Sequence, residues 1–153
     1  MMGLTSRLKA PLWAMGLCVL AANSWAFELV SAQEMKASLA AAEPLMTKAV
    51  AAPGAPQIEI VLPRLDGPVA SPTAIQLTFV PAASSLVRPE TFKVLYGRLR
   101  IDITQRLVNA AKITAEGISV KEASLPKGRH RLLLSIEDQQ GRQGMKSVDF
   151  DIN

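Results

Sequence analysis

The stretch LPKGRHRLLLSIEDQQGRQG, residues 125–144, decides the fold of this chain. From residue 130 its side chains alternate, and the face expected to be buried consists of His130, Leu132, Leu134 and Ile136. A period of two with most of the charge on one face predicts a half-buried β-strand. Pro126 and Gly128 favour a turn before this strand, and a polar loop after it leads to a second alternating run at 146–152. The stretch therefore predicts a strand–loop–strand hairpin.

Shorter alternating runs precede this hairpin at 57–62, 73–80 and 91–96, and the third is expected to continue past Gly97 as a bent edge strand at 99–103. Residues 113–120 are expected to form two short extended pieces around Glu116 and Gly117. Turn residues separate the runs roughly every 8–12 residues, a spacing typical of antiparallel sandwiches. One short helix is expected at 105–110, and no helical pattern is long enough for the crossover that parallel strands require. Residues 57–153 are therefore predicted to be all-β, a single antiparallel sandwich of about seven strands.

Residues 1–26 have the layout of a secretory signal peptide. Arg7 and Lys9 form a positive region, residues 11–22 form an apolar region, and small residues at 24 and 26 favour cleavage after Ala26. Small residues at 30–32 make cleavage after Ala32 a second candidate. The third alternative is an uncleaved anchor, because the uncharged run reaches the lower limit for crossing a bilayer.

A cleaved signal implies a periplasmic or secreted protein. Cys18, the only cysteine, lies inside the apolar region, and Leu17 before it is too large for a lipoprotein cleavage site. The mature chain then holds together by packing alone, without a disulfide, which is ordinary in a bacterial periplasm. The membrane is an expected partner only if the signal segment is retained.

The charge balance gives no reason to expect nucleic acid as a partner. The chain has 17 basic and 13 acidic residues, and removal of the two basic residues of the signal leaves 15 against 13, a net charge of +2. Trp13 and Trp25 also leave with the signal, which disfavours sugar recognition by tryptophan stacking.

Residues 27–56 are rich in alanine and contain three prolines. A short helix is expected within 31–42, where Glu34 follows Ser31 at the spacing of a capping box. The apolar residues are too sparse for a convincing packing stripe, and an isolated helix this short is marginal in water. The segment is therefore predicted to be a flexible or partly helical tether between the signal and the sandwich.

Two motifs carry a resemblance to known modules. LxxGxHxL at 125–132 and IxDxxGR at 136–142 resemble the end of bacterial immunoglobulin-like and fibronectin-III-like domains, and the opening at 63–79 is also similar. The resemblance covers 57–153 and implies a fold, but hardly a function. Where these domains often carry a corner tyrosine, this chain has His130, which is expected to send a ring N–H back to a carbonyl of the preceding turn.

A metal site is the alternative to a contact surface. The SPxxIxLxF run at 71–79 resembles the periplasmic copper-resistance family, whose members bind copper through an N-terminal histidine and further histidine or methionine ligands. This chain has one histidine, its mature N-terminus is Phe27, and Met35, Met46 and Met145 are scattered. A copper-resistance-like or calcium-binding protein is therefore kept as the alternative function.

We expect no enzyme. No serine lies in a Gly-x-Ser-x-Gly elbow, and the single histidine lies within a predicted core strand. Glu137 and Asp138 point to opposite faces, whereas Asp149 and Asp151 share an outward face, as a solvated surface or a weak calcium site would. No catalytic, cofactor or metal residues are assigned.

A basic surface is the one contact site that we expect. It comprises Arg98, Arg100, Arg129 and Arg131, with Lys93 and Lys127 nearby, if the third and penultimate strands pair as in immunoglobulin folds. Such a patch would suit an anionic glycan, a lipid headgroup or an acidic envelope protein, and the alternative is that these charges only guard an exposed sheet face. The sequence thus predicts a non-catalytic exported module that binds or supports by contact.

Overall fold

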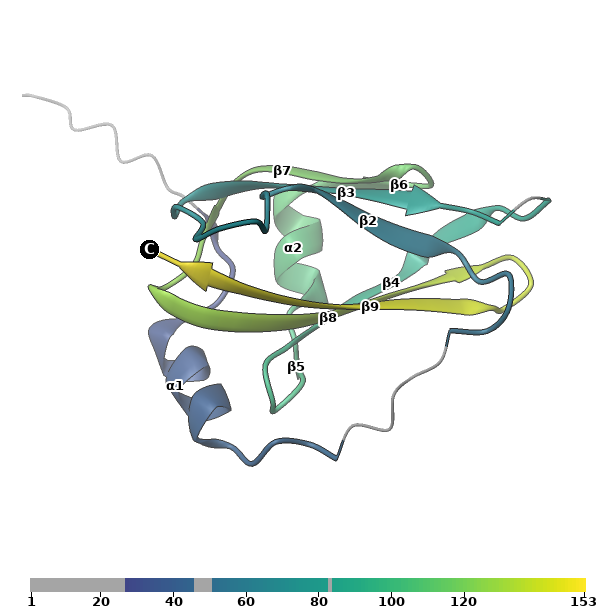
Figure 1. Cartoon of the computed structure of the whole chain (residues 1–153). Coiled ribbons are helices and arrows are strands. Elements are labelled where there is room, and N and C mark those ends of the chain that lie inside the picture. Colours follow the sequence, from purple (N-terminus) through teal and green to yellow (C-terminus); the bar gives the residue numbers. More distant parts are fainter. Residues whose placement is uncertain (1–26, 46–50, 83) are drawn as a thin grey trace, which may run out of the picture.

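The computed structural model describes residues 27–45, 51–82 and 84–153. These residues form two β-sheets packed face to face, with a helix outside and a helix between the layers (Figure 1). The first sheet has the order β1-β7-β3-β2, with β6 paired to β7, and its strands are β1 Phe27–Glu28, β2 Gln57–Leu62, β3 Thr73–Val80, β6 Lys112–Thr114 and β7 Gly117–Ser124. The second has the order β5-β4-β8-β9, with β4 Val87–Tyr96, β5 Ile101–Asp102, β8 Gly128–Asp138 and β9 Gln143–Ile152. The all-β sandwich architecture is confirmed.

The β8–β9 hairpin matches the prediction from its alternating pattern. The two strands pair antiparallel from Gly128↔Ile152 to Glu137↔Gln143. On the predicted inner face His130, Leu134 and Ile136 are buried and Leu132 is half-buried. Opposite them, Ile58, Leu77 and Phe79 of the first sheet are buried, so the core lies between the two layers.

One predicted edge strand is shorter than expected. Residues 99–103 were predicted to extend the third strand, but only β5 remains there, because the chain turns at residues 97–100. Gly97 and Arg100 both take positive φ angles, of 64° and 50°, which break an extended run. The chain then enters α2 Thr104–Ala110, close to the predicted helix, and Leu107 of this helix is buried in the core.

Residues 27–45 are not a tether, which corrects the prediction for this part of 27–56. We call them the N-terminal arm. β1 pairs in parallel with the end of β7, Leu29 and Val30 are 1% and 0% exposed, and α1 Ala32–Ala40 lies against the outer side of the second sheet (Figure 1). The two core residues are adjacent in sequence and precede the helix, so a search for a helical stripe does not detect them. Residues 51–55 are mostly exposed, but Pro56 is buried.

The predicted capping box of α1 is confirmed. The Ser31 hydroxyl accepts a hydrogen bond from the Glu34 backbone N–H at 3.2 Å, and a Glu34 carboxylate oxygen accepts one from the Ser31 N–H at 2.9 Å. The same carboxylate forms a two-pronged ion pair with Arg106 of α2, at 2.6 and 2.7 Å. The hydrogen bond from Arg106 is the main cause that holds the pKa of Glu34 at about 2. This pair fastens α1 to the sandwich.

Among the residues that the structure describes, no helix combines the length and the apolar character needed to cross a bilayer. The predicted signal peptide, residues 1–26, and Met46 lie outside the described residues.

Candidate functional site

His130 has the corner role that the sequence predicted. Its Nε2 lies 2.7 Å from the Pro126 carbonyl oxygen, and its Nδ1 lies 3.0 Å from the Tyr96 hydroxyl. A carbonyl only accepts, so Nε2 carries the proton, and Nδ1 of the neutral ring accepts from the tyrosine. The ring also stacks on Phe150 at a centroid distance of 5.4 Å. Nδ1 therefore joins β8 to β4, and Nε2 joins β8 to the turn that precedes it.

Burial also sets the protonation states of this pair. It lowers the pKa of His130 and raises the pKa of Tyr96 to about 12, because each charged form would lose water. Both side chains are therefore neutral at pH 7. The neutral His130 ring, with a hydrogen bond at each nitrogen, acts here as a structural group.

Folding stability is expected to fall as the pH drops from 7 to 5, because unfolded His130 takes up a proton that the folded state resists. The sign follows because the pKa of His130 is lower in the folded state than in the unfolded state. The contribution of neutral His130 to folding stability is complete above the unfolded pKa and is lost progressively as the pH falls below it. Urea unfolding followed by circular dichroism at several pH values checks this slope. His130→Gln should flatten it in this window, since Glu34 and Asp138, with pKa values of about 2, titrate lower. An unchanged slope in the variant would assign the titration to another group.

Asp138 closes the turn between β8 and β9. One carboxylate oxygen accepts from the backbone N–H groups of Gln140 and Arg142, both at 2.9 Å, and the other accepts from Arg142 Nε at 2.7 Å. Burial alone would raise the pKa of Asp138, but the hydrogen bonds from Arg142 and Gln140 hold it at about 2. The side chain is 0% exposed and serves the turn, so Asp138 and Glu137 do not form a carboxylate pair.

The structure brings the predicted basic residues together in part. β4 and β8 pair antiparallel, as the patch required, and Arg98 and Arg131 both reach the carboxylate of Glu43 at this junction. Arg100 lies in the turn after β4, Lys93 is exposed on β4, and Lys127 is exposed in the turn before β8. The predicted basic patch is therefore centred on Arg98 and Arg131, two of its four arginines.

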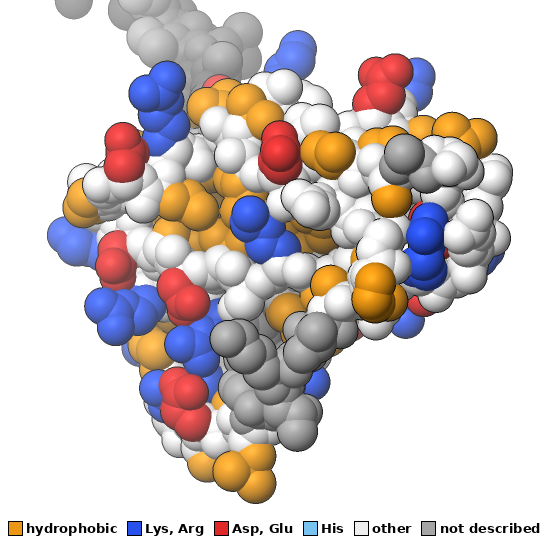
Figure 2. Space-filling model, turned by 45° about the vertical axis from the view of Figure 1, so that its right-hand side comes forward, with side chains coloured by type: hydrophobic (Ala, Val, Ile, Leu, Met, Phe, Trp, Pro, Cys, Tyr) orange, Lys and Arg blue, Asp and Glu red, His pale blue; other side chains and the backbone are white. Residues whose placement is uncertain are grey.

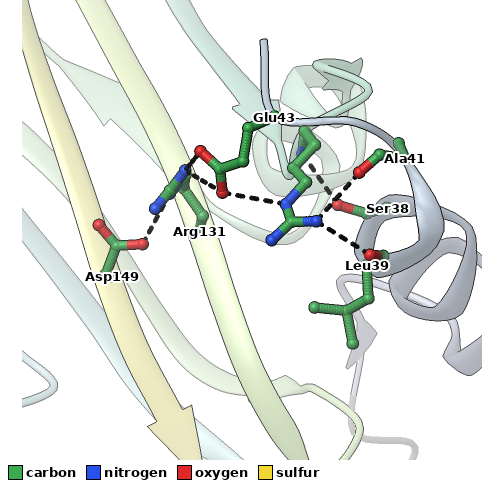
Figure 3. Close-up of polar contacts among 7 residues, drawn as sticks. Ser38, Leu39, Ala41, Glu43, Arg131 and Asp149 are labelled. Carbon is green, nitrogen blue, oxygen red and sulfur yellow. Dashed lines mark hydrogen bonds and ion pairs between the residues drawn. The ribbon is translucent and has the colours of Figure 1, made fainter. Parts of the chain in front are cut away.

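Carboxylates balance this basic surface. Glu43 of the N-terminal arm lies 3.1 Å from Arg98 Nε and 3.3 Å from Arg131 Nη1 (Figure 3). On β9, Asp149 pairs with Arg131 at 2.7 Å, and Asp151 pairs with Arg129 at 3.5 Å. The two aspartates, half-exposed on one face as predicted, are thus ion-pair partners. Sequence reasoning missed Glu43, because it lies in the segment that was taken for a tether.

The possible metal ligands are not gathered. Within the described ranges, no group of three or more His, Cys, Asp or Glu side chains is arranged to hold an ion. Met35 packs beside Gly128, at the opposite end of the β8–β9 hairpin from Met145, which pairs with Ser135. These residues therefore give no support to the copper or calcium alternative.

An apolar cleft lies between the two sheets. It is a narrow space of about 40 Å³, partly open to solvent, and its walls present no polar surface. Its walls include Leu29, Ile60, Leu62, Leu65, Ile75, Leu77, Val94, Leu107, Leu125, Leu132, Leu134, Val148 and Phe150. Leu62 and Leu65 remain 37% and 39% exposed, so they mark its mouth, while Leu29 of the N-terminal arm is buried at its inner wall. Figure 2 shows hydrophobic side chains gathered in a hollow of the surface.

The described residues therefore define a two-sheet all-β domain with a polar corner, a balanced arginine cluster and an apolar cleft. In comparisons with known proteins, no family model, no curated protein and no solved structure matches this chain.

Proposed function

We propose that this chain is a non-catalytic, exported binding module with an immunoglobulin-like sandwich, and that it holds an apolar group of an envelope partner in the cleft between its sheets. The strand order supports the immunoglobulin-like assignment: β2 pairs with β3 and β3 with β7, while β4 pairs with β8 and β8 with β9. His130 at the corner position supports it as well.

The apolar cleft is the observation that carries the proposal. Apolar concave sites are where proteins usually bind ligands, and a space of about 40 Å³ with no polar surface admits a small apolar group, such as the end of an aliphatic side chain, rather than a whole ligand molecule. Each methylene moved from water into such a site contributes about 0.8 kcal/mol. His130 and Asp138, the two buried titratable side chains that sequence reasoning weighed for chemistry, serve structural roles instead.

Export rests on the signal-like residues 1–26, and the N-terminal arm supports one of the two cleavage sites. Cleavage after Ala32 would remove Leu29 and Val30, which are buried in the core, together with the Ser31 cap of α1. Cleavage after Ala26 leaves all three in place. The mature protein is therefore expected to begin at Phe27, in the periplasm or outside the cell.

Binding of a neutral apolar probe tests the cleft. Xenon, an apolar atom small enough for this space, is expected to bind the native protein saturably, as followed by the xenon NMR chemical shift. Leu62→Trp narrows the mouth and should weaken binding at least tenfold. Leu86→Trp, at a 61% exposed leucine outside the cleft, is the matched control and should bind normally. Equal binding by both variants would place the probe elsewhere.

A further inference from the structure

We propose that Arg98 and Arg131 form a recognition site for a glutamate- or aspartate-bearing peptide segment of a partner protein, and that the chain's own Glu43 occupies this site. The site is on the outer side of the second sheet, and none of its residues lines the apolar cleft. It therefore stands independently of the cleft proposal.

The guanidinium groups of Arg98, in the turn after β4, and of Arg131, on β8, meet one carboxylate from the N-terminal arm, that of Glu43. Arg98 Nε lies 3.1 Å from one Glu43 oxygen, and Arg131 Nη1 lies 3.3 Å from the other. Asp149 accepts from Arg131 Nε at 2.7 Å and thereby fixes the orientation of this guanidinium. Two oriented cations around one carboxylate are an arrangement that recognises an acidic side chain.

The segment that occupies the site is a peptide whose main chain Arg98 also holds, and these carbonyl contacts stay with the arm when a partner's carboxylate replaces that of Glu43. Arg98 Nη1 donates to the carbonyl oxygens of Leu39 and Ala41, both at 3.0 Å, while Arg98 Nε holds the Glu43 carboxylate. One side chain thus contacts two peptide carbonyls and the acidic group that follows them. A polar hollow of about 100 Å³ at this point, bordered by Gly97 and Arg129, leaves room beside Glu43.

Glu43 is held more weakly than the rest of the arm. It lies three residues after the end of α1, its side chain is 55% exposed, and Leu45 beyond it is 99% exposed. Ion pairs at such exposure contribute little to stability. By contrast, α1 is anchored by the two-pronged Glu34–Arg106 pair and by Leu29 and Val30 in the core. A partner can therefore displace Glu43 while the helix remains docked.

The test uses the full chain as exported and a fluorescent peptide with the sequence of residues 37–45, ASLAAAEPL. Fluorescence anisotropy measures its affinity at low and high salt. Glu43→Gln removes the internal competitor and is expected to tighten binding about twofold to fivefold, because an exposed ion pair worth up to about 1 kcal/mol no longer occupies the site. High salt should weaken the complex. The same peptide with glutamine in place of its glutamate should bind far more weakly.

Two variants serve as controls. Arg131→Gln should abolish the gain of Glu43→Gln, and it leaves the Arg98 contacts to α1 intact, so the fold is retained. Glu90→Gln removes an exposed glutamate that pairs with Arg88 away from the site and should match the unmodified protein. Unchanged affinity on Glu43→Gln would overturn the proposal. So would a site that binds a sulfated oligosaccharide through Arg131 but does not bind the acidic peptide.

Discussion

A chain that begins at Gln33 is expected to fail to fold, whereas a chain that begins at Phe27 is expected to fold. The shorter chain lacks β1, the Ser31 cap and the side chains of Leu29 and Val30, which are 1% and 0% exposed in the full structure. Loss of one buried leucine to alanine costs about 2–5 kcal/mol, and a domain of this size has about 5–15 kcal/mol in total. Removal of residues 27–32, with both buried side chains, is therefore expected to cost most of the free energy of unfolding.

Circular dichroism and urea unfolding of the two chains provide the measurement. Leu29→Ala gives a graded form of the same test, with an expected loss of about 3 kcal/mol in the free energy of unfolding. Leu39→Ala is the matched control, since Leu39 on α1 is 47% exposed and its loss should cost less than about 0.5 kcal/mol. Equal unfolding midpoints for the two chain lengths would restore the tether interpretation of residues 27–45.

Local patterns predicted the parts of the fold that depend on local alternation. β8 carries its buried side chains at every second position, and the turn residues on both sides of it limit its length. β2 and β3 begin and end at the predicted residues for the same reason. The N-terminal arm escaped this reasoning because Leu29 and Val30 follow no period, and because their burial depends on β7, some 90 residues further along the chain.

The candidate sites can also be divided into contacts that follow from local strand patterns and contacts that depend on tertiary packing. The approach of Arg98 to Arg131 was predictable, since it follows from pairing of the third and penultimate strands. Their shared partner Glu43 was not predictable, because it lies more than fifty residues before Arg98, on an arm whose docking is a tertiary event. The cleft was also invisible, because residues such as Leu77 and Leu134 look the same in sequence whether the two sheets meet or leave a gap.

Replacement of Gly117 by alanine is expected to lower the free energy of unfolding by roughly 3 kcal/mol or more. Gly117 begins β7, where it pairs with Thr78 of β3 and Thr114 of β6. Its φ angle is 153°, and an added Cβ would run into the carbonyl oxygen of Leu77. That atom belongs to the backbone of β3, which is held between β2 and β7 and has no room to withdraw. The clash between the added Cβ and the Leu77 carbonyl can therefore be relieved only if β7 moves away from β3.

Two other glycines distinguish this clash from the general cost of losing a glycine. Gly141 has a φ angle of 74° but nothing within 4 Å of an added Cβ, so Gly141→Ala should cost only about 1–2 kcal/mol of backbone strain. Gly67 has neither a positive φ angle nor a close neighbour, so Gly67→Ala should be neutral or slightly stabilising. Urea unfolding of the three variants should rank them in that order. If Gly117→Ala costs no more than Gly141→Ala, β3 and β7 are not in the close contact that joins the two halves of the first sheet.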